Sequence, residues 1–118
     1  MKAIRGAITV PENTHDAIFE ATQCLIAEIA RRNDLQPIEV VSTFFTLTPD
    51  LNADFPARAA RAMGWDTPML DMQEVPVPGA LPRCIRVLLH VERTGPVHHA
   101  YLREARTLRP DLERGSTE

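Results

Sequence analysis

The chain has 118 residues, of which 44% are hydrophobic, and its 13 basic and 16 acidic side chains leave a formal charge of −3. This composition is typical of one soluble domain spanning residues 1–118, and the acidic balance argues against a dedicated binder of nucleic acids or anionic membranes. Apart from Lys2, every basic residue is an arginine. Because the planar guanidinium binds carboxylates and phosphates bidentately, these anions are the expected ligands.

The cysteines and the N-terminus bear on the cellular location of the protein. Cys24 and Cys84 are far apart in the sequence and neither belongs to a CxxC pair, which fits a reducing compartment. The N-terminal apolar run is too short for a signal peptide, and no stretch approaches the roughly 18 apolar residues of a transmembrane helix. We therefore expect a cytoplasmic protein.

The first two predicted elements are a strand and a long helix. Residues Lys2 to Val10 alternate between polar and apolar side chains and stop at a proline, which predicts a strand. From Asp16 to Arg32, apolar side chains recur every three or four residues, which predicts an amphipathic helix. Thr14 or Asn13 is its expected N-cap, and Asn33 is its expected C-terminal stop.

A second strand and a short helix are expected next. Residues Val40 to Thr48 are mostly β-branched or aromatic and carry no charge, which predicts a strand in the middle of a sheet with both faces covered. Residues Phe55 to Gly64 predict a short helix, with proline in the first turn and glycine just past the end. Arg58 and Arg61 would then share one helix face.

The C-terminal half is expected to add strands. Pro68 to Val75 and Arg83 to Glu92 predict an antiparallel hairpin joined by a proline-rich connection. Ala100 to Leu108 has helix-forming residues, but its position after a Thr-Gly-Pro turn favours a strand. The polar residues 111–118 are expected to form a mobile tail. The order of elements predicts an α+β domain in which a mixed sheet packs on one long and one short helix.

The sequence lacks the common catalytic motifs. No serine has a GxSxG context, the histidines lack metal-ligand spacing, and the glycines form no phosphate loop. We therefore expect no covalent intermediate, no metal and no nucleotide cofactor. Arg5 and Arg86 remain as arginines within apolar strand patterns. A structural ion pair of Arg86 with Glu74 across the hairpin, or simple exposure on an edge strand, stays open beside a role in ligand binding.

Several stretches, taken in order, resemble the small monofunctional bacterial chorismate mutases of the trimeric class. They span nearly the whole chain and comprise Arg5–Val10, Thr48–Leu51, Phe55–Ala59, Met72–Glu74, Cys84–Val87, Tyr101–Leu102 and Leu108–Leu112. The resemblance implies an isomerase that rearranges chorismate to prephenate in phenylalanine and tyrosine biosynthesis, without metal or cofactor. Such an intramolecular Claisen step depends on holding the reactive conformer and stabilising the charge that develops.

The resemblance also implies roles for the candidate residues. Arg86 would donate to the ether oxygen and engage the enolpyruvyl carboxylate, which Arg5 and Tyr101 would also hold. Glu74 would accept a hydrogen bond from the ring hydroxyl. Phe55 and Ala57 would supply an apolar wall from the neighbouring subunit, and Arg58 and Arg61 would bring positive charge near the ring carboxylate or the entrance. The backbone around Leu70 and Asp71 would line the pocket, and Leu108 with Arg109 would close over it.

Three features depart from the family pattern. Asp71 stands where a cysteine is common, which would bring a second carboxylate close to Glu74 and shift the pKa of one of them. Arg58 stands where a lysine is common, which keeps the charge but changes the hydrogen-bond geometry. The segment Arg93 to His99 is shorter than usual, which bears on the approach of Tyr101 to the substrate.

For the assembly, the resemblance implies a homotrimer whose sheets form a pseudo-α/β barrel, with active sites at the subunit interfaces. The apolar strand at Val40 to Thr48 is compatible with this, since a single helix covers only one of its faces. Two alternative functions compete: a non-catalytic trimeric small-molecule-binding domain, and an enamine/imine deaminase of similar fold. Retention of the principal site residues together argues against the first, and the lack of the deaminases' glycine-rich motifs argues against the second.

Overall fold

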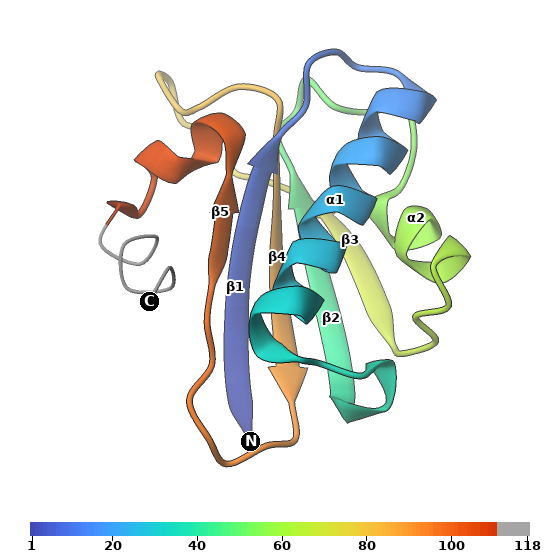
Figure 1. Ribbon diagram of the computed structural model, residues 1–118. Helices are drawn as coiled ribbons and strands as arrows, with labels where there is room; N and C mark the ends of the chain where they lie inside the picture. The colour runs from blue at the N-terminus through green and yellow to red at the C-terminus, as the bar shows by residue number, and fades with distance from the viewer. Residues whose placement is uncertain (111–118) are drawn as a thin grey trace.

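The computed structural model describes residues 1–110, which form a mixed five-stranded sheet with two α-helices against one face (Figure 1). The expected mobile tail, residues 111–118, lies outside the described residues. The predicted α+β class is confirmed. In chain order the elements are β1 (Lys2–Thr9), α1 (His15–Asn33), β2 (Val40–Leu47), α2 (Pro56–Ala62), β3 (Met69–Gln73), β4 (Cys84–Val91) and β5 (Ala100–Leu102), with short 3-10 helices at Pro37–Glu39 and Arg103–Thr107.

The strand order β3-β2-β4-β1-β5 places β2 and β4 side by side in the interior of the sheet. Strand β4 is antiparallel to both β1 and β2, whereas β3 is parallel to β2 and β5 is parallel to β1. The predicted hairpin between β3 and β4 is therefore wrong, because β2 lies between them. The connection over residues 74–83 is too long for a tight turn, and the most apolar strand, β2, takes the place between the two.

Helix α1 begins and ends at identifiable caps. Thr14 Oγ1 accepts a hydrogen bond from the N–H of Ala17 at 3.1 Å, which confirms the predicted N-cap. At the other end, Asp34 adopts the left-handed conformation (φ 47°) in place of the predicted Asn33. Asn33 stays in the helix because its buried side-chain amide donates to the carbonyl oxygen of His98 at 2.8 Å.

The hydrophobic core lies between the helices and the sheet. Its largest fully buried side chains include Ile4, Ile8, Ile18, Leu25, Ile26, Ile29, Phe45, Ile85 and Leu89. The opposite face of the sheet is less well covered, since Phe44 and Leu88 are half-buried and Leu70 and Met72 are 57% and 41% exposed. Within one chain, strand β2 is thus fully covered only on its helix side.

The segment Ala100 to Leu108 was predicted to be one strand, and this prediction is wrong beyond Leu102. Strand β5 has only three residues, and a 3-10 helix follows it. Arg103 has a φ of 56°, which turns the chain out of the strand. Its Nη2 donates to both carboxylate oxygens of Glu20 at 2.8 Å, which ties this turn to α1.

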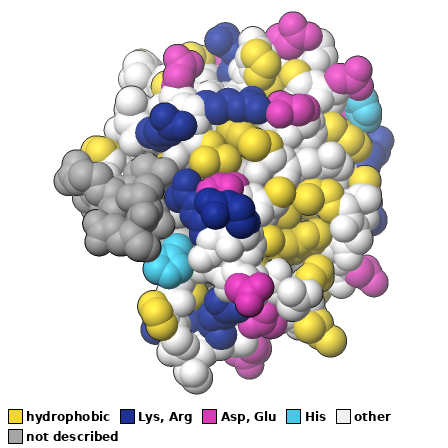
Figure 2. Space-filling view, in the orientation of Figure 1, with side chains coloured by type: hydrophobic (Ala, Val, Ile, Leu, Met, Phe, Trp, Pro, Cys, Tyr) yellow, Lys and Arg dark blue, Asp and Glu magenta, His cyan; other side chains and the backbone are white. Residues whose placement is uncertain are grey.

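Charged side chains on the helix side of the molecule lie in mixed clusters of both signs (Figure 2). Hydrogen bonds from Arg31 and Arg32 lower the pKa of Glu28 to about 2 against the opposing effect of burial. These ion pairs hold the last turn of α1.

Within residues 1–110, no helix combines the length and the apolar character needed to cross a membrane.

Candidate active site

The sheet face that points away from the helices holds a pocket of about 480 Å³, which we call the arginine pocket. Its walls come from several strands and from the segment after β5, and include Arg5, Phe44, Thr46, Met72, Arg86, Leu88, Tyr101 and Arg109. In the sheet register, Arg86 lies opposite Ala7 on one side and Thr46 on the other. Because side chains alternate along a strand, Arg5 and Arg86 therefore point to the same face. Apolar walls and cationic groups make this pocket suitable for a small organic anion.

Arg86 and Glu74 form the polar centre of the arginine pocket. Their Nη2 and Oε1 atoms are 2.9 Å apart, so the ion pair left open by the sequence exists. The pair does not span a β3–β4 hairpin, because β2 lies between these strands. Glu74 instead lies beside the end of β2, where its N–H donates to the Leu47 carbonyl oxygen at 2.7 Å. Within residues 1–110, Arg86 Nε and Glu74 Oε2 are buried without a hydrogen-bond partner, as is Thr46 Oγ1. Such atoms are costly unless a ligand pairs with them.

The C-terminal part of the described chain completes this pocket. Tyr101 is buried on β5, opposite Ala7 of β1, and Leu108 packs against the same small cluster. Arg109 lines the pocket as well. Tyr101 therefore lines the same pocket as Arg86, from the strand on the far side of β1, with Ala7 between the two residues.

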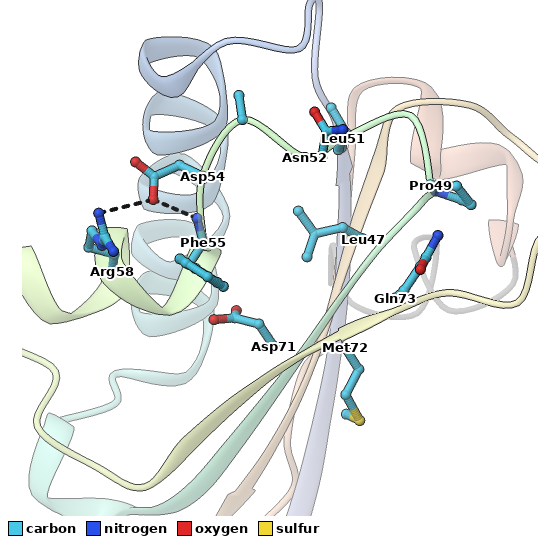
Figure 3. Close-up of a pocket in the computed structure, with 11 residues that line it drawn as sticks. Leu47, Pro49, Leu51, Asn52, Asp54, Phe55, Arg58, Asp71, Met72 and Gln73 are labelled. Carbon is cyan, nitrogen blue, oxygen red and sulfur yellow. Dashed lines mark hydrogen bonds and ion pairs between the residues drawn. The ribbon is translucent and has the colours of Figure 1, made fainter.

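A second hollow, of about 550 Å³, lies where α2 begins, and we call it the α2 pocket (Figure 3). It is bounded by the loop after β2, the first turn of α2 and strand β3, with Asp54, Phe55, Arg58 and Asp71 among its residues. The Phe55 side chain is 55% exposed. Met72 of β3 lines both pockets.

Asp54 organises the α2 pocket. Its carboxylate accepts a hydrogen bond from the N–H of Phe55 at 2.7 Å, lies 2.5 Å from His15 Nδ1, and is 3.6 Å from Arg58 Nη1. The bond from Phe55 and then that from His15 lower the pKa of Asp54. The guanidinium of Arg58 also lies over the Phe55 ring, 5.4 Å from its centroid. These contacts fix Phe55 and Arg58 relative to each other.

Asp71 reaches from β3 to the first turn of α2. Its Oδ1 accepts a hydrogen bond from the N–H of Ala57 at 3.1 Å, and the N-cap residue Phe55 offers no side-chain cap of its own. Burial raises the pKa of Asp71, while Ala57 and Arg61 oppose the shift. The pKa of Asp71 is thus raised mainly by burial, and the acidic neighbour that contributes is Asp54 and not Glu74, the partner expected from the sequence.

Comparisons with known proteins agree with this geometry. A family model described as chorismate mutase type I matches residues 1–112. The chain belongs to this family. It is 49% identical over 118 residues to the chorismate mutase AroH of Thermus thermophilus, covering 96% of this chain and 97% of that protein. It is 41% identical over 117 residues to the chorismate mutase AroH of Bacillus subtilis (strain 168), covering 95% and 92%. A solved chorismate mutase from Clostridium thermocellum superposes with a TM-score of 0.88 at 46% identity, covering 91% of this chain and 99% of that one.

In this chorismate mutase family member, the candidate residues fall into two groups within one chain. At the arginine pocket lie Arg5, Glu74, Arg86, Tyr101, Leu108 and Arg109. On α2, β3 and the α2 pocket lie Phe55, Ala57, Arg58, Arg61, Leu70 and Asp71. Ala57 is buried in α2, whereas Arg61 and Leu70 are exposed. The two groups do not share a pocket in the described part of a single chain.

Sequence reasoning missed several residues that line the arginine pocket. They are Phe44, Thr46, Met72 and Leu88. Met72 belongs to the Met72–Glu74 stretch that carries the resemblance, but no role was assigned to it, and the other three stand at alternate strand positions without a recognisable motif. Once β2 is known to pair with β4, the alternation relative to Arg86 identifies Thr46 and Leu88, but that pairing is not visible in the sequence.

The available side-chain chemistry is donation of hydrogen bonds and placement of charge. Among residues 1–110, no three His, Cys, Asp or Glu side chains are grouped closely enough to hold a metal ion together. Burial raises the pKa of the Cys84 thiol to about 11, so this group next to the arginine pocket residues is protonated at neutral pH. A site of this kind can bind, orient and stabilise an anionic substrate.

Proposed function

We propose that the chain converts chorismate to prephenate in the arginine pocket. Membership of the chorismate mutase type I family makes the chain an isomerase of aromatic amino acid biosynthesis. The observation that carries the choice of pocket is the Arg86–Glu74 pair, whose Nε and Oε2 atoms are buried and have no hydrogen-bond partner among the residues that the structure describes. A substrate with carboxylate, ether and hydroxyl oxygens supplies groups that match this donor and this acceptor.

The reaction needs position and charge more than acid–base chemistry. One C–O bond of the ether breaks while a C–C bond forms within the same molecule, and no proton is transferred. As the C–O bond breaks, negative charge grows on the ether oxygen. Arg86, already held by Glu74, would donate to that oxygen without first reorganising, and this is the kind of stabilisation that lowers a barrier most effectively.

The remaining groups of the arginine pocket would select the reactive conformer. Arg5 and Tyr101 would hold the enolpyruvyl carboxylate above the ring, with Arg86 sharing that contact. Glu74 Oε2 would accept from the ring hydroxyl. Leu108 and Arg109 would cover the bound substrate. Folding the side chain over the ring in this way converts a rare conformer of the free substrate into the bound one.

A homotrimer would bring the two pockets together. The exposed apolar residues Phe55, Leu70 and Met72 lie where one chain leaves its sheet face and α2 pocket uncovered. In a trimer with a pseudo-α/β barrel core, the α2 pocket of one subunit would close the arginine pocket of the next. Arg58 and Arg61 would then contribute positive charge to the substrate's ring carboxylate. Each subunit would be one domain, working in the cytoplasm.

The competing functions are not favoured. A non-catalytic binding domain or an enamine/imine deaminase of similar fold would share the scaffold of this family but not its chemistry. The family match extends over residues 1–112, and the identity to relatives named chorismate mutase is as high as 49% over 118 residues.

Cofactor-free turnover of chorismate tests the proposal. Purified protein is added to chorismate, the loss of its ultraviolet absorbance is followed, and the product is identified by NMR. Rapid formation of prephenate is the expected result. If a folded, trimeric preparation left chorismate unchanged, the non-catalytic binding domain would be the better description.

A further inference from the structure

The imidazole of His99 makes an unusual contact with the backbone of Arg5. The N–H of Arg5 donates to His99 Nδ1 at 2.9 Å. The β1–β5 ladder begins at the next pair, Gly6 with Ala100. A side-chain nitrogen therefore provides the acceptor just before the ladder, where a continuing parallel strand would offer a carbonyl oxygen.

The backbone of this segment is held from the other side by α1. Asn33 Nδ2 donates to the carbonyl oxygen of His98 at 2.8 Å, and Asn33 Oδ1 accepts from the N–H of His98 at 2.7 Å. Arg32 Nη1 donates to the carbonyl oxygen of His99 at 2.9 Å. With its backbone fixed to the helix, His99 can use its ring to set how β5 lies along β1. Tyr101 follows within the same strand.

The contact requires a neutral ring. A nitrogen that accepts from a backbone N–H must keep its lone pair, so the proton of His99 is on Nε2. The half-buried ring lies among cationic groups: burial first, then Arg5, Arg109 and His98, lower the pKa of His99 below its usual 6.5. Protonation would place two N–H groups against each other and add charge beside arginines.

We propose that neutral His99 is a positioning residue for the mutase reaction, which sets the register of β5 on β1 and thereby holds Tyr101 next to Arg5 in the arginine pocket. This inference rests on the proposed function. It gives His99 no contact with the substrate; the residue acts through the backbone of Arg5 and through the strand that carries Tyr101.

Two substitutions separate this role from general structural support. His99→Asn keeps an acceptor at the same branch point, because Oδ1 replaces Nδ1, but it cannot be protonated in the working range. His99→Leu removes the acceptor and leaves the Arg5 N–H unpaired. We expect kcat/KM of His99→Leu to fall roughly tenfold at pH 8. The loss should fall mainly on KM, because the carboxylate is bound in substrate and transition state alike. His99→Asn should remain within about threefold of wild type at pH 8.

The pH profile is the decisive readout. Between pH 7.5 and 5, wild-type kcat/KM should fall more steeply than that of His99→Asn. His98→Asn is the matched control: it should keep the steep fall and move it slightly to higher pH, because His98 is the last of the groups that lower the pKa of His99. Hydrogen exchange of the Arg5 amide, measured by NMR, should speed up in His99→Leu and, at low pH, in wild type relative to His99→Asn. Equal profiles and equal Arg5 exchange in wild type and both His99 variants would overturn the positioning role while leaving the mutase activity intact. A wild-type protein without any chorismate turnover would instead overturn the proposed function on which this role rests.

Discussion

Arg86 shows how a structural contact can prepare a residue for catalysis. Its Nη2 is held 2.9 Å from Glu74, while its Nε is buried and has no hydrogen-bond partner in the described part of the chain, residues 1–110. Because the ion pair is formed before the substrate binds, fixing the Arg86 guanidinium adds little to the free-energy cost of binding. The remaining donor is thereby held in place for charge that appears only as the reaction proceeds.

Replacing Arg86 by Ala should lower kcat at least about 100-fold, because a preorganised donor to the developing charge is lost. Steady-state kinetics with chorismate measure the effect, and circular dichroism checks that the fold persists. Arg106→Ala, which removes an exposed arginine on the 3-10 helix after β5, is the matched control and should retain wild-type kcat. A nearly normal kcat in Arg86→Ala would remove this residue from the mechanism.

Asp71 makes a prediction about stability and pH. Its pKa in the folded protein is raised by burial above the usual 3.8, so above pH 3.8 the native state binds more protons than the unfolded state and ionisation destabilises the fold. Asp71→Asn removes this penalty and keeps an oxygen for the N–H of Ala57. The melting temperature of the variant should exceed that of wild type at pH 7, and the difference should shrink as the pH falls through the raised pKa of Asp71 and be lost below about 3.8.

Asp66→Asn is the control for that experiment, because it removes an exposed carboxylate with the same change in net charge. A melting temperature for Asp71→Asn below that of wild type at pH 7 would show that the ionised carboxylate is the better cap for α2.

At the scale of elements, local patterns were sufficient for some parts of the fold and insufficient for others. The apolar stripe of α1 and the uncharged run of β2 predicted both elements to within a few residues, because burial imposes the helical or extended period on the sequence. The β3–β4 hairpin was wrong, because nothing local in the sequence of either strand tells which strand is its neighbour. The end of β5 depended on the left-handed backbone of Arg103, which side-chain patterning does not reveal.

The same distinction applies to the candidate site. Arg5 and Arg86 were recognisable because charge within an apolar strand needs a partner. Phe44 and Leu88, by contrast, look like ordinary strand residues, and only the register shows that they share a pocket with Arg86. The role of Asp71 as a cap for α2 rests on a contact between β3 and α2 that local spacing does not encode.

Gly6 is a position where the backbone of β1 lies against side chains of α1. A Cβ at this residue would lie 2.8 Å from Ile29 Cδ1, 3.1 Å from Leu25 Cδ1 and 3.1 Å from the carbonyl oxygen of Ala100. Gly6→Ala should therefore lower the free energy of unfolding by about 1–3 kcal/mol through overpacking. Urea denaturation measures this, and Gly95→Ala, with open space around its Cβ, is the control. Unchanged stability in Gly6→Ala would mean that α1 can shift away from β1 without penalty.

At the scale of the whole molecule, the division of candidate residues between two pockets predicts a site shared between subunits. Arg86→Ala and Phe55→Glu should each be nearly inactive alone. When they are co-expressed, mixed forms of the proposed trimer should regain part of the wild-type turnover, because some interfaces would combine an intact arginine pocket with an intact α2 pocket. Turnover of mixed trimers purified through two different affinity tags measures the rescue.

The matched control combines Arg86→Ala with Arg5→Ala. Both changes fall in the arginine pocket, so no interface of a mixed trimer is complete and no rescue is expected. Failure of the first pair to gain activity, despite confirmed mixing, would place the whole site within one subunit.

The position of β4 in the sheet has a consequence for synthesis on the ribosome. Strand β4 separates β1 from β2, and its register joins Lys2 to Val91. Until residues 84–91 have left the exit tunnel, β1 and the β2–β3 pair have no common neighbour, and α1 has no finished sheet against which to bury its apolar side. Most of the chain must therefore be translated before β1 can pair with β4. Folding of the nascent protein depends on this late pairing between distant parts of the sequence.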